Sequence, residues 1–162
     1  MRVIKNNEVI NDDWQLIREI DCSNSIPEGK FIIPFNDWQS CRDDLLKRNE
    51  EHAVWIDGDI ETEVLLDDLE HFSLIALDFP AFKDGRSYSH ASLLKSRYNF
   101  KGELRAIGDV LRDQLFFMHR CGIDSYEVRE DKDIDDALKS LQDFSVKYQT
   151  AADGALPIYK QR

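Results

Sequence analysis

From residue 31 onward the chain repeats one pattern, a short apolar run followed by a longer stretch of helical periodicity. The runs begin at about residues 31, 53, 74, 104 and 125, and the helical stretches after them cover 37–49, 60–71, 89–98, 110–121 and 133–142. Short apolar runs that alternate with amphipathic helices are typical of βα units, whose parallel strands are buried on both faces. The pattern therefore predicts an α/β fold with about five consecutive βα units and a parallel sheet.

Two architectures satisfy this pattern, an open doubly wound sheet and an incomplete TIM-like barrel. The chain has 162 residues, which is too short for the eight units of a full barrel. The compact units and the tight turn over 121–124 favour the barrel-like geometry. An incomplete barrel leaves sheet edges uncovered, and a homodimer is one way to cover them.

Shorter apolar pairs, Val3-Ile4 and Val9-Ile10, precede the βα units and are followed by the run 14–17. Asn and Asp residues separate them and supply turns, so this region predicts a short N-terminal β-meander. The segment 150–162 has little periodicity and is expected to be a loose tail. We therefore predict one α/β domain over 1–149, with N-terminal strands in 1–20 and βα units in 31–142.

The charge balance excludes some classes of partner. The chain has 21 Lys and Arg against 32 Asp and Glu, a formal net charge of −11. General nucleic-acid binding and docking on anionic membranes both depend on a basic face. We expect neither for this protein.

The three cysteines, Cys22, Cys41 and Cys121, include no Cys-x-x-Cys pair, so they predict neither an iron–sulfur cluster nor a zinc site. An odd number of cysteines in an acidic chain favours free thiols in a reducing cytoplasm. The first residues lack the apolar stretch of a secretory signal. We therefore expect a cytoplasmic protein.

Ligands of parallel α/β proteins bind at the carboxyl ends of the strands. The residues that follow the predicted strands there include Asp57, Asp78, Asp109 and Arg129. Carboxylates at neighbouring strand ends suit acid–base chemistry, which makes Asp78 and Asp109 the candidate catalytic residues. Asp is also a favoured helix N-cap at such junctions, so capping stays open as the alternative role of both.

One long loop, residues 78–89, follows the third of these strands. Its Asp84-Gly85 turn presents Arg86, and Ser87 or Ser89 can cap the next helix. A helix N-terminus beside a guanidinium is suited to binding an anion. The alternative is a plain turn and cap, with Arg86 paired to Asp78 or Asp109. The candidate ligand-binding residues are Lys83, Arg86, Ser87, Ser89, Arg105 and Arg129.

The distribution of charge supports an anionic ligand. Residues 83–112 contain seven basic and three acidic side chains, a net charge of +4, which leaves −15 for the rest of the chain. By contrast, 57–70 contains seven acidic and no basic side chains, and suits either a solvated face or a docking face for a basic partner. The four histidines lack metal-ligand spacing, and no dinucleotide or Walker motif is present. We expect no metal and no cofactor.

Four segments carry a resemblance to a known family: LIALDFPAFKDGRSYS (74–89), GELRAIGDVLRDQ (102–114), RCGID (120–124) and DFSVKYQ (143–149). Over residues 31–149 the chain resembles an uncharacterised bacterial family described as an oxidoreductase of sulfite reduction. The resemblance implies a role beside sulfite reductase in sulfur assimilation, and it supplies no catalytic residues.

Three hypotheses for the function follow. The leading one is an accessory protein of assimilatory sulfite reduction that binds a small anion at the strand carboxyl ends, with sulfite reductase as its partner. The second is an independent enzyme that acts on a small acidic substrate through the strand-end Asp and Arg residues. The third is a non-catalytic interaction module.

Overall fold

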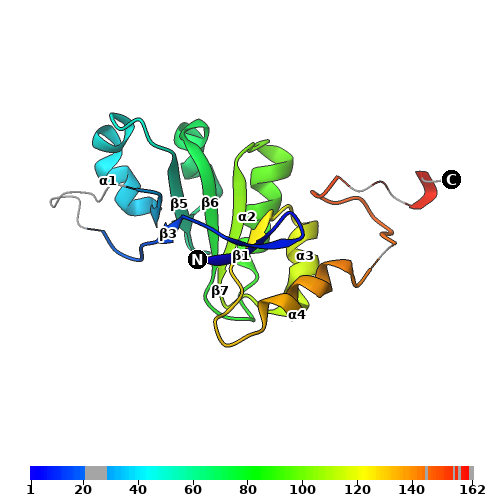
Figure 1. Ribbon diagram of the computed structural model, residues 1–162. Helices are drawn as coiled ribbons and strands as arrows, with labels where there is room; N and C mark the ends of the chain where they lie inside the picture. The colour runs from blue at the N-terminus through cyan, green and yellow to red at the C-terminus, as the bar shows by residue number, and fades with distance from the viewer. Residues whose placement is uncertain (21–28, 145, 155, 157, 161–162) are drawn as a thin grey trace.

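The computed structural model describes residues 1–20, 29–144, 146–154, 156 and 158–160. Within these residues, eight strands form one sheet that curls into half of a barrel in a mixed α/β fold (Figure 1). The sheet order is β2-β1-β8-β7-β6-β5-β4-β3. The strands are β1 (Arg2–Lys5), β2 (Glu8–Asn11), β3 (Gln15–Leu16), β4 (Phe31–Pro34), β5 (His52–Ile56), β6 (Phe72–Phe79), β7 (Glu103–Gly108) and β8 (Ser125–Tyr126).

The strand order distinguishes between the two predicted architectures. β3 to β8 follow one another across the sheet in chain order, and each neighbouring pair among them is parallel. A doubly wound sheet needs a reversal of strand order, and β3 to β8 contain none. The doubly wound alternative is therefore wrong. Winding in one direction with crossovers of one hand places the connecting helices on one face of the sheet.

The helical segments are shorter than their periodicity predicts. Leu111 is extended, with φ −116° and ψ 156°, so the helix expected over 110–121 begins only after it. The stretch expected as a helix over 60–71 is a 3-10 helix. The segments are α1 (Phe35–Leu46), η1 (Thr62–His71), α2 (Arg86–Ser92), η2 (Leu93–Arg97), η3 (Arg112–Gln114), α3 (Leu115–Arg120), α4 (Ile134–Lys139), η4 (Ser140–Gln142) and η5 (Ile158–Lys160).

Two apolar clusters cover the two faces of the sheet. The larger one lies between the sheet and the helices and includes Val54, Ile75, Trp38 of α1 and Leu115 of α3. Successive strand residues point to opposite faces of the sheet. Ala53 and Leu74, which precede Val54 and Ile75, therefore belong to the second cluster, on the concave face. That cluster consists of Trp14, Ile32, Ala53, Leu74, Ala76 and Ile107, with Leu16 and Trp55 packed against it.

The N-terminal segment crosses the concave face. β1 and β2 form an antiparallel hairpin whose turn residues, Asn6 and Asn7, both have positive φ, at one side of the sheet. β3 pairs with β4 at the opposite edge, so the connection between β2 and β3 must span the sheet, as the blue chain in Figure 1 does. The predicted three-stranded meander is therefore wrong. Trp14 explains why β3 does not pair with β2. Its side chain is buried on the concave face, which places the segment after β2 across the sheet.

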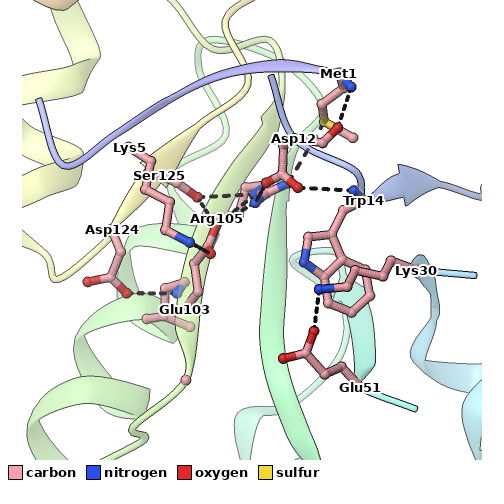
Figure 2. A network of polar contacts seen from close by, with 12 residues as sticks. Met1, Lys5, Asp12, Trp14, Lys30, Glu51, Glu103, Arg105, Asp124 and Ser125 are labelled. Atoms are coloured by element: carbon pink, nitrogen blue, oxygen red, sulfur yellow. Dashed lines mark hydrogen bonds and ion pairs between the residues drawn. The ribbon is translucent and has the colours of Figure 1, made fainter. Parts of the chain in front are cut away.

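A buried ion network fastens this segment to the sheet (Figure 2). Arg105 of β7 is completely buried and is ion-paired with Asp12 of the crossing segment. Its Nε donates to Glu103 Oε1 at 3.0 Å and to Ser125 Oγ at 3.1 Å. Lys5 of β1 donates to the other Glu103 oxygen at 2.6 Å. The network therefore holds two cations and two anions, and it links β1, β7, β8 and the crossing segment.

Both carboxylates of the network stay ionised. Burial raises the pKa of Asp12, but the hydrogen bond from the Trp14 backbone and the charge of Arg105 outweigh it and leave the pKa below its usual value. Burial also raises the pKa of Glu103, and the charge of Arg105 with hydrogen bonds from Lys5 and Ser125 outweighs that effect. The stability that these pairs supply is present above the ordinary carboxyl pKa and is lost as the pH falls through the lowered values.

The segment expected to be a loose tail is attached at its start. The Asp153 side chain is 1% exposed and accepts two hydrogen bonds from Arg120 of α3, at 2.9 and 3.0 Å. Lys147 donates to the same carboxylate at 2.7 Å. These contacts hold the residues around Asp153 against α3.

The cysteines differ from the prediction of free thiols. Cys41 of α1 is disulfide-bonded, and Cys121 is free and buried. The prediction is therefore wrong for Cys41, because spacing along the chain does not reveal which thiols approach one another. Cys22 lies outside the described residues. Among the described helices, none has the length and apolar character to span a bilayer.

We predict that Arg105→Met lowers the free energy of unfolding by about 3–5 kcal/mol, because it leaves Asp12 without its ion pair and Glu103 with Lys5 as its remaining counter-charge on the covered face. Urea denaturation at neutral pH measures the loss. Arg86→Met is the matched control, since Arg86 is exposed and its pairs are screened by solvent. Equal losses in the two variants would contradict a structural role for the buried network.

Candidate functional site

The carboxyl ends of β6, β7 and β8 place side chains in one row on the concave face. Asp78 is paired with Ile107, and Ala106 is paired with Tyr126. Glu127, which directly follows Tyr126, therefore lies beside Ile107 on the side away from Asp78. Neighbouring strands are about 4.8 Å apart, so the backbones of Asp78 and Glu127 are separated by about 10 Å.

A cleft of about 510 Å³ opens at this end of the sheet. Its walls come from the segment after β3, from the end of β7 and from the segment after β8. It is lined by Leu16, Arg18, Gly108, Glu127, Val128, Arg129, Glu130 and Asp131. The cleft therefore lies where parallel α/β proteins bind their ligands.

Arg18 is the cation of the cleft with the fewest contacts. Its Nη1 lies 3.1 Å from Asp78 Oδ1, and its guanidinium lies 5.0 Å from the centre of the Trp55 ring. Trp55 is held in turn by a hydrogen bond of 2.8 Å from its Nε1 to the Ile17 carbonyl. The Arg18 side chain is 49% exposed. One ion pair and one ring contact use only part of the five donors of a guanidinium, so the others can meet a ligand.

Asp78 is a buried carboxylate with Arg18 as its counter-charge. The residue is 8% exposed, and within the described part of the chain its Oδ1 receives no hydrogen bond besides the ion pair with Arg18. Ser87 Oγ donates to the Asp78 carbonyl at 2.6 Å, which fixes the backbone at this point. The buried position and the fixed backbone give Arg18 a defined anchor.

Glu127 has the environment of an acid–base residue. Burial raises its pKa, against the opposing charges of Arg105, Arg18 and the amino terminus. Its Oε2 is buried and has no hydrogen-bond partner among the described residues. A carboxyl whose ionisation is this poorly compensated is suited to exchange a proton with a ligand.

Gly108 lets the ends of β6 and β7 lie close together. Its φ is +93°, which disfavours any residue with a side chain. A Cβ at this position would lie 2.6 Å from the Phe79 carbonyl oxygen and 2.8 Å from Asp78 Oδ1. Only glycine fits between the strand end and the buried carboxylate.

The structure separates the sequence-predicted site residues. Asp78 lies beside the cleft and Arg129 lines it. Asp109 pairs with Arg129 at 2.7 Å and accepts a hydrogen bond from the Phe82 backbone, so it fastens the long loop and does not cap the following helix. Arg129 also pairs with Asp131 at 2.6 Å. Its charge is thus neutralised by two carboxylates.

The loop around Arg86 forms a separate, exposed arrangement. Arg86 pairs with Asp84 at 2.7 Å and with Asp59. Hydrogen bonds from the side chain and backbone of Arg86 lower the pKa of Asp84 to about 2. Lys83 and Ser89 are exposed, while Ser87 is buried. The expected pairing of Arg86 with Asp78 or Asp109 is wrong, because the 57–59 turn supplies a nearer carboxylate.

Arg105 does not line the cleft. It is enclosed beneath the crossing segment and ion-paired with Asp12 and Glu103. The net charge of +4 over 83–112 is therefore compensated in space by acids from other parts of the chain. A sequence window cannot show this compensation.

Residues 53–159 match the model of a family described as bacterial proteins of unknown function (DUF934). The chain belongs to this family. The match includes β5 to β8 and the tail up to 159, whereas the expected resemblance ran over 31–149. Comparisons with curated proteins and with solved structures find no match.

The family match covers only one wall of the cleft. Glu127 and Gly108 lie inside the matched range, and Arg18 lies before it. Sequence reasoning missed both Arg18 and Glu127. The sequence pattern predicts a strand over 125–129 that contains Glu127, whereas β8 ends at Tyr126 and leaves Glu127 at the strand end. Nothing in the sequence indicates that the N-terminal segment brings Arg18 across the sheet.

The described residues include no group of three His, Cys, Asp or Glu side chains arranged to hold a metal ion. The chemistry that this arrangement offers is binding of an anionic group by Arg18 and proton exchange by Glu127.

We predict that Glu127→Gln raises the free energy of unfolding at neutral pH. The folded-state pKa of Glu127 lies above the unfolded value, so its ionisation destabilises the fold at high pH. The gain should shrink as the pH falls and vanish below the ordinary glutamate pKa of 4.5. Urea denaturation of both proteins across this range measures it, and a gain that does not depend on pH would contradict the assignment.

Proposed function

We propose that this protein binds a small molecule by its anionic group in the cleft at the carboxyl ends of β6 to β8. The observation that carries the proposal is the half-exposed Arg18 guanidinium, held over Trp55 beside a buried carboxylate and opposite Glu127. The cleft is of the size that small ligands use.

Arg18 is the anchor for the anionic group. Of the two arginines that line the cleft, Arg129 already contacts Asp109 and Asp131, whereas Arg18 contacts one carboxylate, Asp78. A guanidinium with spare donors forms strong, charge-assisted hydrogen bonds to carboxylate, phosphate or sulfur oxyanions. The Trp55 ring limits the positions open to the Arg18 side chain and so reduces the entropy lost on binding.

Glu127 is the group that would exchange a proton. It lines the same cleft, and its raised pKa keeps the neutral acid populated to a higher pH than in an ordinary glutamate. A neutral carboxyl can donate a hydrogen bond to a bound oxyanion, and an ionised one can accept a proton from the ligand. This arrangement favours the hypothesis of a small-molecule enzyme.

A role in sulfite reduction is the cellular context that we propose, on the basis of the family resemblance. Sulfite is a small oxyanion of the kind that Arg18 is suited to bind. Whether sulfite or another sulfur oxyanion stabilises the protein tests this context, and the anion site itself does not depend on the outcome.

The interaction-module hypothesis has less support, because acids of the 57–70 segment have partners within the chain. Asp68 is buried and accepts hydrogen bonds from Trp38 at 2.9 Å and from Arg42 at 2.5 Å. Glu63 accepts one from Tyr98, and Asp59 pairs with Arg86.

We predict that anions raise the thermal midpoint of the wild-type protein and that Arg18→Gln abolishes this shift. The panel contains sulfite, sulfate, phosphate and small carboxylic acids at constant ionic strength. Arg86→Gln is the matched control, because Arg86 is equally exposed but lies on the other loop. It should keep the wild-type response.

Loss of the response in Arg86→Gln but not in Arg18→Gln would move the anion site to the long loop. A panel without any stabilising anion would remove the proposed function. Stabilisation by carboxylic acids without stabilisation by sulfite would keep the site and remove the sulfite context.

A further inference from the structure

The charges of the cleft are unevenly distributed between its two walls. Arg18 stands on the wall formed by the segment after β3. The wall after β8 carries Glu127, Glu130 and Asp131, and the charge of Asp131 is taken up by Arg129 and Lys132. Glu127 and Glu130 are therefore the acids of this wall that keep charge available for a ligand.

A ligand with only an anionic group would compensate the charge of Arg18 but not the charges of Glu127 and Glu130. It would neutralise Arg18, but it would bring a second negative charge towards Glu127 and Glu130. The buried Glu127 Oε2 has no hydrogen-bond donor among the described residues, and the charges of Arg105, Arg18 and the amino terminus compensate its ionised form only in part. A donor that carries a positive charge, placed at the cleft-facing side of Glu127, would supply this compensation.

We propose that the ligand of this cleft is a small zwitterion of the amino-acid type, with its carboxylate on Arg18 and its ammonium group on Glu127. This inference rests on the proposed function and adds the second charge to the ligand. The backbones of Asp78 and Glu127 are about 10 Å apart. This separation leaves room for a small molecule between the Glu127 side chain and the Asp78–Arg18 pair. In this arrangement the cleft binds both charged groups of one small molecule.

The groups around Glu127 determine what binding does to its proton. Arg105 from β7, Arg18 after β3 and the Met1 amino group favour its ionised form, whereas burial and Glu130 disfavour it. An added ammonium group favours the ionised form of Glu127, so binding of a zwitterion releases a proton from this carboxyl. An anion without an ammonium group has the opposite effect and takes up a proton.

The test begins with a thermal-shift panel of the twenty protein amino acids. For those that bind, titration calorimetry compares each amino acid with the same molecule without its ammonium group and with the same molecule without its carboxylate. We expect the amino acid to bind at least about tenfold more tightly than either, because each lost charge leaves a charged group of the cleft unpaired. Titrations at mildly acidic pH in two buffers of different ionisation enthalpy give the number of protons released.

Two variants assign the two ends of the ligand. Glu127→Gln is expected to weaken amino-acid binding about tenfold or more and to abolish proton release, while binding of the acid without an ammonium group changes little. Arg18→Gln is expected to weaken both. Glu130→Gln controls for a general loss of negative charge and should have the smaller effect, because Glu130 is exposed.

The possible outcomes separate the two proposals. If no amino acid binds, or if acids without the ammonium group bind equally well and take up protons, the zwitterion proposal is overturned, and an Arg18-dependent anion response still supports the proposed function. If amino acids bind with proton release in wild-type protein but not in Glu127→Gln, the zwitterion proposal is supported. If neither ligand class responds to Arg18→Gln, both proposals fail.

Discussion

The buried ion network around Arg105 determines how the N-terminal segment is attached to the sheet. A guanidinium with no exposed surface is stable only when its charge is matched, and Asp12 and Glu103 provide that match. Asp12 belongs to the N-terminal segment, so the requirement for charge balance decides where that segment lies. The segment crosses the concave face of the half-barrel, where Trp14 joins the apolar cluster of that face.

This placement creates the candidate site. The crossing segment leads into β3, which is only two residues long, and Arg18 follows two residues after its end. A strand this short contributes few hydrogen bonds, so the ion network and the Trp14 cluster do most of the positioning. One wall of the cleft therefore depends on contacts made several residues earlier in the chain. The other wall, with Gly108 and Glu127, is built by the parallel strands themselves.

The sequence predicts the parts of the fold that depend on local pattern. The mixed α/β class, the N-terminal hairpin and the position of the strand ends all follow from periodicity and turn residues. Asp78 was found in this way, because a polar residue directly after a buried strand is visible in the sequence. The position of β3 was not, because pairing with β4 depends on the burial of Trp14 on a face that local pattern cannot identify.

The predicted anion site shows that the sequence also does not reveal which charges are paired in the folded chain. Arg86, Arg105 and Arg129 form a basic set along the chain, yet in space each is neutralised by acids such as Asp59, Asp12 and Asp109. Arg18 is the less compensated cation, and it stands in a segment whose neighbours in sequence give no sign of a ligand. Charge along the chain therefore does not show where the less compensated cation lies.

The Asp12–Arg105 ion pair holds the crossing segment and thereby the Arg18 wall of the cleft. Hydrogen exchange at the Gln15 and Ile17 amides, which donate to the Lys30 and Ile32 carbonyls, measures this directly. In Asp12→Asn we expect faster exchange at both amides and unchanged exchange at Val54 and Ile75 in the central strands. Exchange at Gln15 and Ile17 that matches the wild-type protein would contradict this role of the ion pair.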